Sequence, residues 1–200
     1  MLTFRQLREK LEYRKQEGES HLLHHITPHE FDSFKPMSHF GTHDAARARA
    51  SFLAKHELPS SSDSSHEKYT GSPEIFNKRQ KETKFNIYST RLKLGKVIDV
   101  PDIAEDRPSK LLDMLSKHKH IPHETVVELT KKSLGHGGLT HEHIAKALNK
   151  HGIDTLRYKN KWEDPGKTSY MITRPDQVRV LRKTKSTLNL KRGWDKLADE

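Results

Sequence analysis

The chain has 200 residues, which is enough for one domain of ordinary size with appendages, and its 32% hydrophobic content predicts a small core. Its 37 Lys and Arg outnumber 27 Asp and Glu, so the net charge of +10 favours polyanionic partners such as nucleic acid or acidic protein surfaces. Cysteine is absent and no apolar run is long enough to span a membrane, which excludes disulfides, thiolate zinc sites and membrane spans.

The first 18 residues form a separate segment in this interpretation. Thr3 and Gln6 make a capping-box pattern, and the apolar residues that follow share one helical face, so a helix is expected before Gly18. It either docks on a partner or packs on the domain. Because the segment lacks the apolar core of a signal peptide, we expect a cytoplasmic protein.

Two strands and two helical elements are predicted next. A buried strand covers residues 21–26, and Thr27 followed by Pro28 predicts a short helical turn through residue 34. A second strand covers residues 38–42, where Thr42 caps an Ala-rich helix that can lie close to a sheet.

The middle of the chain alternates between a polar stretch, a long strand and three helices. Residues 57–72 are rich in Ser and predict a flexible insertion inside the domain. The longest strand is expected at 85–94; Gly95 breaks it, and it continues at an edge. Helices are predicted at 108–119, 122–134 and 140–150. Histidines near these helices suit a solvated surface better than a metal site, so no metal is expected.

Residues 154–181 predict three short strands separated by two breaks. The first break contains Asp164, Pro165 and Gly166, and it places a loop with Asn160, Trp162 and Glu163 at a sheet edge. After residue 182, a basic tail (183–200) ends with Trp194 and acidic residues. The tail either contacts a phosphate backbone or solubilises the chain.

Two ordered sets of residues resemble motifs of the ADP-ribosyltransferase-like proteins that are common in phage genomes. The first set is Leu23-His24-His25-Ile26-Thr27, with His39-Phe40-Gly41-Thr42 and Ala45-Ala46 after it, and the second is Tyr158, Asn160, Glu163, Ser169, Tyr170, Pro175 and Gln177. The resemblance implies an α+β fold over residues 19–182, with a small split β-sheet of the ADP-ribosyltransferase type and surrounding helices.

The resemblance also implies roles in binding NAD. His25 is expected to hold the nicotinamide ribose hydroxyls, which suits an imidazole that is neutral near pH 7, and Thr27 is expected to grip the same ligand. Phe40 is expected to stack on nicotinamide, with His39 as second candidate, although Phe40 fits a core equally well. The remaining expected NAD-binding residues are Gly41, Thr42 and Asn160.

The expected catalytic carboxylate is Glu163. In the related poly-ADP-ribose polymerases the catalytic Glu directly precedes a Tyr-apolar strand, and Ser169 stands at that position here. Glu163 lies on the loop just before this strand. Lys161 and Lys167 flank it in the sequence and favour its ionised form.

Two functions follow as alternatives. In the first, a phage-type mono-ADP-ribosyltransferase uses NAD to modify a host protein or nucleic acid. In the second, the fold is kept without activity, and the basic protein is a binding or virion-associated module that contacts nucleic acid. Ile26, which replaces the family's usual Gly, and Ser169 favour the second alternative; Asn160 and Glu163 favour the first.

Overall fold

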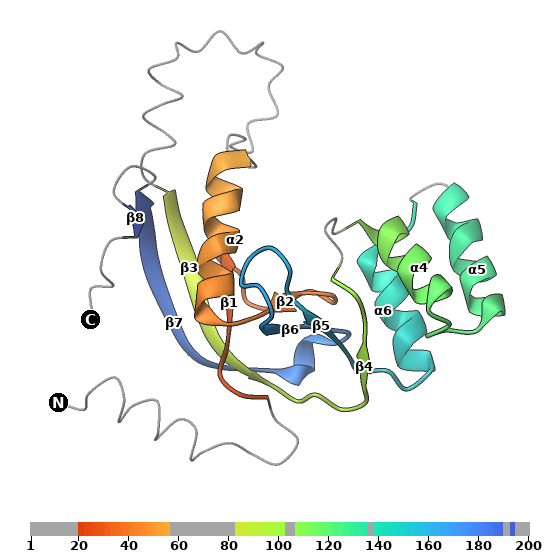
Figure 1. The fold of residues 1–200 in the computed structure, drawn as a ribbon. Coiled ribbons are helices and arrows are strands. Elements are labelled where there is room, and N and C mark those ends of the chain that lie inside the picture. The colour runs from red at the N-terminus through yellow and green to blue at the C-terminus, as the bar shows by residue number, and fades with distance from the viewer. Residues whose placement is uncertain (1–19, 57–82, 103–106, 136–137, 190–192, 195–200) are drawn as a thin grey trace, which may run out of the picture.

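The computed structural model describes residues 20–56, 83–102, 107–135, 138–189 and 193–194. Within them the chain folds into two four-stranded sheets with helices around them (Figure 1). The predicted α+β class is confirmed. The predicted helix at 1–18, the insertion at 57–72 and the end of the tail lie outside the described residues.

The first sheet has the strand order β1-β3-β7-β8 and is antiparallel throughout. Its central strand β3 (Thr83–Leu92) lies between β1 (Leu23–Thr27) and β7 (Val178–Asn189), with β8 (Gly193–Trp194) beyond β7. The long strand predicted at 85–94 is therefore present. Because its two faces alternate, Phe85 and Ile87 pack in one core cluster and Tyr88 and Leu92 in another.

The second sheet has the strand order β2-β6-β5-β4. Strands β5 (Thr155–Lys159) and β6 (Thr168–Ile172) form a hairpin, β2 (His39–Phe40) pairs with β6, and β4 (Val97–Asp99) is a parallel edge strand beside β5. The chain crosses from the first sheet to the second at Gly95, whose φ is +54°. A Cβ there would lie 2.3 Å from Asp154 Oδ2, so this crossing requires glycine.

Helix α2 (His43–His56) covers one face of the first sheet (Figure 1). It begins as predicted, because the Thr42 hydroxyl accepts a hydrogen bond from the Ala45 backbone N–H at 3.1 Å. Its small residues Ala46, Ala50 and Ala54 pack against Phe85 and Ile87 of β3. Close contact between helix and sheet follows from this stripe of alanines.

Helices α4 (Pro108–Lys117), α5 (His123–Leu134) and α6 (His141–Lys150) follow one another as predicted. They connect β4 to β5 and share a core cluster with Leu156 and Met171 of the second sheet. α6 begins with a capping box between Thr140 and His143. The predicted ends of these helices differ from the observed ones by no more than two residues.

Gln177 connects the two sheets. The side-chain oxygen Oε1 of Gln177 accepts hydrogen bonds from the backbone N–H groups of Thr173 (3.1 Å) and Arg174 (2.9 Å). Its amide donates to the carbonyl of Lys93, after β3, at 2.9 Å and to the hydroxyl of Thr155, in β5, at 3.1 Å. With 2% of its surface exposed, this side chain uses its full hydrogen-bonding capacity inside the fold.

Two predicted boundaries were wrong. The helical turn after Thr27 does not form, because Phe31 and Phe34 turn inward and pack against Tyr88. The last strand does not end at residue 181: β7 continues to Asn189, paired with β3 down to Leu188. Residues 183–189, assigned to a basic tail, are therefore part of the first sheet, since backbone pairing with β3 outweighs their charge.

Candidate functional site

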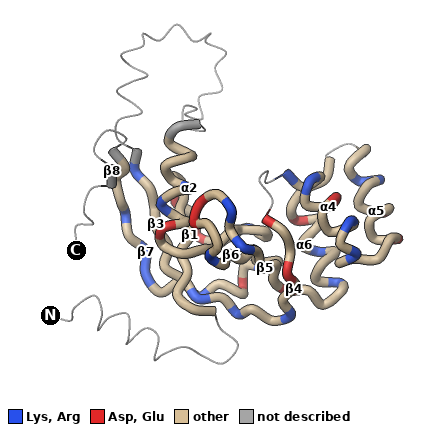
Figure 2. The backbone as a smooth tube through the Cα atoms, viewed as in Figure 1, with Lys and Arg blue, Asp and Glu red and all other residues tan. Residues whose placement is uncertain are grey.

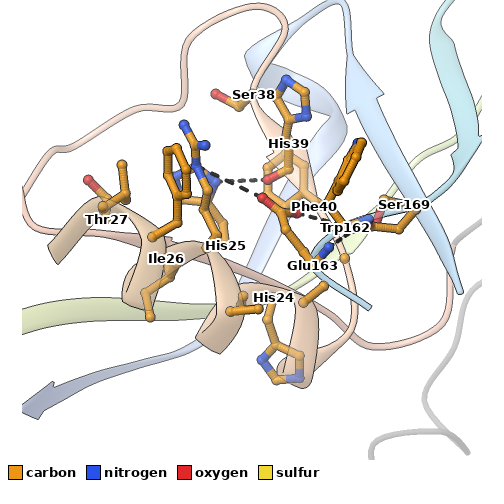
Figure 3. A pocket seen from close by; sticks show the side chains of 18 of the residues that line it. His24, His25, Ile26, Thr27, Ser38, His39, Phe40, Trp162, Glu163 and Ser169 are labelled. Carbon is orange, nitrogen blue, oxygen red and sulfur yellow. Dashed lines mark hydrogen bonds and ion pairs between the residues drawn. The ribbon is translucent and has the colours of Figure 1, made fainter. Parts of the chain in front are cut away.

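A cavity of about 1270 Å³ brings together residues from both sheets. It is lined by β1, β2, α2 and the loop between β5 and β6. Figure 3 shows Thr27 and Ile26 on one side of it and Trp162, Glu163 and Ser169 on the other. Most of the residues predicted for the site line this cavity: His25, Thr27, His39, Phe40, Gly41, Asn160 and Glu163.

His25 is held in one tautomer. Its Nδ1 lies 2.8 Å from the backbone carbonyl of His39, so this nitrogen carries the proton and donates it. The ring packs against Phe34 and Phe40, with centroid separations of 5.3 and 5.5 Å. Burial, aided by the nearby charge of Arg49, lowers the pKa of His25 to about 4. At neutral pH the ring is therefore uncharged, with the lone pair on Nε2 as its acceptor.

Glu163 is oriented by the side chain of Asn160. The Asn160 amide donates to Glu163 Oε2 at 3.2 Å, and its carbonyl accepts from the backbone N–H groups of Trp162 (3.1 Å) and Glu163 (2.9 Å). Asn160 is only 3% exposed, so it positions the carboxylate from beneath the cavity surface. The NAD-binding role predicted for Asn160 stays a prediction, since this residue also lines the cavity.

Among the described residues, the cation that pairs with Glu163 is Arg49 of α2, rather than Lys161 or Lys167. Arg49 Nε lies 4.0 Å from Glu163 Oε1, and both side chains are partly exposed in the cavity. The Arg49 guanidinium also lies over the Phe52 ring, 5.4 Å from its centroid. Sequence reasoning missed Arg49, which lies just after the first motif but more than a hundred residues before Glu163, and which α2 brings beside that carboxylate.

The loop between β5 and β6 is anchored to α2. Asp164 accepts a short hydrogen bond from the Thr42 hydroxyl, 122 residues away in sequence. Thr42 therefore caps α2 and holds the loop. It was predicted to bind NAD, but it is not among the residues that line the cavity. Gly166, with φ +82°, donates a hydrogen bond from its backbone N–H to the backbone carbonyl of Asn160 at 2.8 Å, and this contact closes the loop.

Gly41 has a packing role. A Cβ at this position would lie 2.8 Å from Ser169 Oγ and 3.1 Å from Ala45 Cβ. Ser169 is buried and accepts a hydrogen bond from the Asn160 amide at 3.4 Å. Glycine therefore allows β2, β6 and the start of α2 to approach one another beneath the loop.

The aromatic residues of the site divide into buried and exposed ones. Phe40 is 1% exposed and belongs to the core, which disfavours the stacking role predicted for it. His39 is fixed by a 2.9 Å hydrogen bond between its Nδ1 and the Tyr158 hydroxyl. Trp162 and Phe52 are 74% and 47% exposed at the cavity. Trp162 and Phe52 therefore supply exposed aromatic rings at the cavity.

Residues Ile26 and Thr27 close the cavity on the β1 side. The Ile26 side chain is buried against Ala46 and Ala50 of α2. The Thr27 hydroxyl accepts a hydrogen bond from the backbone N–H of His29 at 3.2 Å, which leaves its proton available to a ligand. Ile26 thus contributes to the core between β1 and α2.

Comparisons of the chain with protein-family models, curated proteins and solved structures found no match. The resemblance to ADP-ribosyltransferase-like proteins stays a prediction that rests on the motifs. Among the residues that the structure describes, no three His, Asp or Glu side chains are placed to hold a metal ion. In the same part of the chain no helix combines the length and apolar character needed to cross a membrane.

Proposed function

We propose that the protein is a mono-ADP-ribosyltransferase that uses NAD to modify a macromolecule. The observation that supports this best is that a positioned carboxylate, Glu163, and a neutral, tautomer-fixed imidazole, His25, line one cavity. At about 1270 Å³ the cavity exceeds the usual size of a pocket for a drug-sized ligand, which suits a dinucleotide.

The reaction cleaves the bond between nicotinamide and ribose. Nicotinamide leaves with the bonding electron pair, positive charge develops on the ribose, and an acceptor atom forms the new bond as it loses a proton. A fixed anion stabilises charge that appears in the transition state. Glu163 would supply this anion, because Asn160 holds its carboxylate in place before the substrate arrives.

His25 would bind the ribose in the ground state. Its Nε2 can accept a hydrogen bond from a ribose hydroxyl, since Nδ1 already donates to the His39 carbonyl. The Thr27 hydroxyl, on the same strand, can donate to the ligand. Arg49 would bind the diphosphate, because its partly exposed guanidinium lines the cavity and can donate two parallel hydrogen bonds to phosphate oxygens.

The alternative is a binding module that keeps this fold without turnover. It is favoured by Ser169, which stands where the related polymerases carry their catalytic Glu and is buried here beneath the loop. The alternative predicts that NAD is not cleaved. A requirement of Glu163 for NAD turnover would distinguish the transferase from the binding module.

The deciding experiment measures nicotinamide release and transfer of labelled ADP-ribose from NAD to macromolecules of a host lysate. Glu163→Gln keeps the shape and removes the charge, so turnover should fall roughly 100-fold or more while NAD affinity changes little. Glu128→Gln, at an exposed position of α5 where the carboxylate pairs with Lys132, is the matched control. Equal turnover in Glu163→Gln and the parent would remove Glu163 as the catalytic group, and no turnover in the parent would favour the binding module.

A further inference from the structure

The loop between β5 and β6 exposes an unusual combination of side chains. Trp162, at 74%, is among the most exposed large hydrophobic residues of the described chain, and Phe52 on α2, at 47%, also lines the cavity. Exposed apolar side chains that gather around one cavity are typical of a ligand-binding surface, whereas scattered single ones are not. The two rings, from two different elements, therefore mark a surface for a flat, apolar group.

The basic and acidic side chains of the same loop differ in exposure. Lys161 and Lys167 are exposed, whereas Glu163 and Asp164 are partly buried and hydrogen-bonded to Asn160 and Thr42. Asp102, which also lines the cavity, accepts the backbone N–H of Lys161 at 2.7 Å. The exposed charged groups of the loop are therefore cations, on either side of Trp162.

Basic residues alone do not define this site. Figure 2 shows Lys and Arg along β7 and on α4, α5 and α6 as well. The loop differs because its lysines flank an exposed indole, and because the Arg49 guanidinium lies over the Phe52 ring at 5.4 Å. Cations beside exposed aromatic rings are the combination that binds single-stranded nucleic acid, whose phosphates and bases are both accessible.

We propose that Trp162, Phe52 and the flanking Lys161 and Lys167 bind a single-stranded nucleic acid, with a base stacked on Trp162 at the cavity mouth. Duplex DNA would not fit this surface, because its bases are stacked inside the helix. The net charge of +10 favours approach of such a polyanion.

Bound there, the strand is the acceptor of the transferred group, and this part of the inference rests on the proposed function. A ring or exocyclic nitrogen of the base forms the bond to the ribose carbon as nicotinamide leaves with the electron pair, and the proton of that nitrogen passes to water. Trp162 follows Asn160 and precedes Glu163 on the same loop, so a base stacked on it lies beside the carboxylate.

The test measures binding of fluorescent 12-mer single-stranded DNA and RNA to the full chain by anisotropy, without NAD. Trp162→Ala should weaken binding about tenfold or more, and Trp162→Phe should restore most of it, because base stacking needs a ring. The control Leu134→Ala removes a more exposed apolar residue, 85%, on α5 and should change nothing.

A salt titration tests the lysines. For single strands, log K falls with log salt by about 0.7 for each phosphate neutralised, so Lys161→Ala with Lys167→Ala should reduce this slope by about 1.4. Lys131→Ala with Lys150→Ala removes the same charge from exposed positions on α5 and α6 and should reduce it less.

Excess NAD distinguishes the strand from the dinucleotide. Oligonucleotide binding should persist with NAD present and in Glu163→Gln, so a failure of catalysis does not remove the inference. It is overturned if the parent binds no oligonucleotide, if duplex binds as tightly as single strands, or if Trp162→Ala binds as the parent does. It is also overturned if NAD displaces the strand and Trp162→Ala weakens NAD binding equally, because Trp162 then holds the dinucleotide's own base.

Discussion

His25 illustrates how a backbone contact decides the chemistry of a side chain. The His39 carbonyl fixes the proton on Nδ1, and burial keeps the ring neutral at physiological pH. The sequence predicted His25 as a site residue from its motif. It did not predict the partner, because the contact depends on tertiary structure: the antiparallel bridge between His24 and Gly41 brings β1 beside β2.

Replacement of His25 should weaken NAD binding. His25→Phe keeps a ring between Phe34 and Phe40 but removes the Nε2 acceptor, so we expect affinity to fall roughly threefold to tenfold, the worth of one neutral hydrogen bond. Calorimetric titration with NAD measures this, with His123→Phe, at an exposed position on α5 that does not line the cavity, as control. Unchanged affinity would remove His25 from the site.

Residue roles at the loop show where sequence reasoning stops. Asn160 and Glu163 were predicted for the site from their resemblance to a family motif, but the direction of each side chain was not. Asn160 points beneath Glu163 and supports it, and Thr42 points away from the cavity to Asp164. Arg49 was missed because its contact with Glu163 joins α2 to the distant loop.

At the scale of elements, the strands and helices with strong periodicity were predicted, and the exceptions have tertiary causes. The Thr27–Pro28 signal is local, and aromatic packing of Phe31 and Phe34 overrides it. The end of β7 was missed because the basic residues after 182 indicated a tail. The structure pairs Lys183 and Lys185 with β3, and the charge of these residues does not reveal this pairing. A truncation that tests the tail must therefore retain residues through 189.

Loss of the Gln177 side chain, which connects the two sheets, should reduce the stability of the fold. Gln177→Ala leaves the backbone N–H groups of Thr173 and Arg174 and the Lys93 carbonyl without their buried partner. We expect the free energy of unfolding to fall by about 2–4 kcal/mol, because each buried unpaired polar group costs about 1–3 kcal/mol. Urea unfolding measures the change, and the exposed Asp176→Ala, one residue earlier, is the control. A loss no larger than that of the control would contradict this link.

At the scale of the whole molecule, the buried histidines couple stability to pH. Burial is the main cause that lowers the pKa of both His24 and His25 from 6.5 to about 4, with His43 adding to the effect on His24. Because the unfolded chain binds these protons more readily, stability should fall as pH drops from about 6.5 toward 4.

Thermal unfolding from pH 7.5 to 4.5 measures this dependence. The midpoint should decrease steadily below pH 6.5, and more gently in His25→Phe, which lacks one of the two groups. Exposed carboxylates such as Asp99, whose pKa is lowered by the hydrogen bond from Arg157, contribute only near and below their ordinary value of 3.8. A flat profile above pH 4.5 would show that folding does not lower the pKa of His24 and His25.

The strand order also sets the sequence in which the parts that line the cavity can fold during synthesis. β3 leaves the ribosome well before its partner β7, with the three helices and most of the second sheet between them. The β5–β6 hairpin can close at once, but the first sheet waits for residues near Leu188, a long-range closure that folds slowly. A nascent chain therefore carries Glu163 on a formed hairpin before the first sheet is complete. The packing of β1 and α2, which line the cavity, is completed only when Leu188 of β7 joins their core cluster.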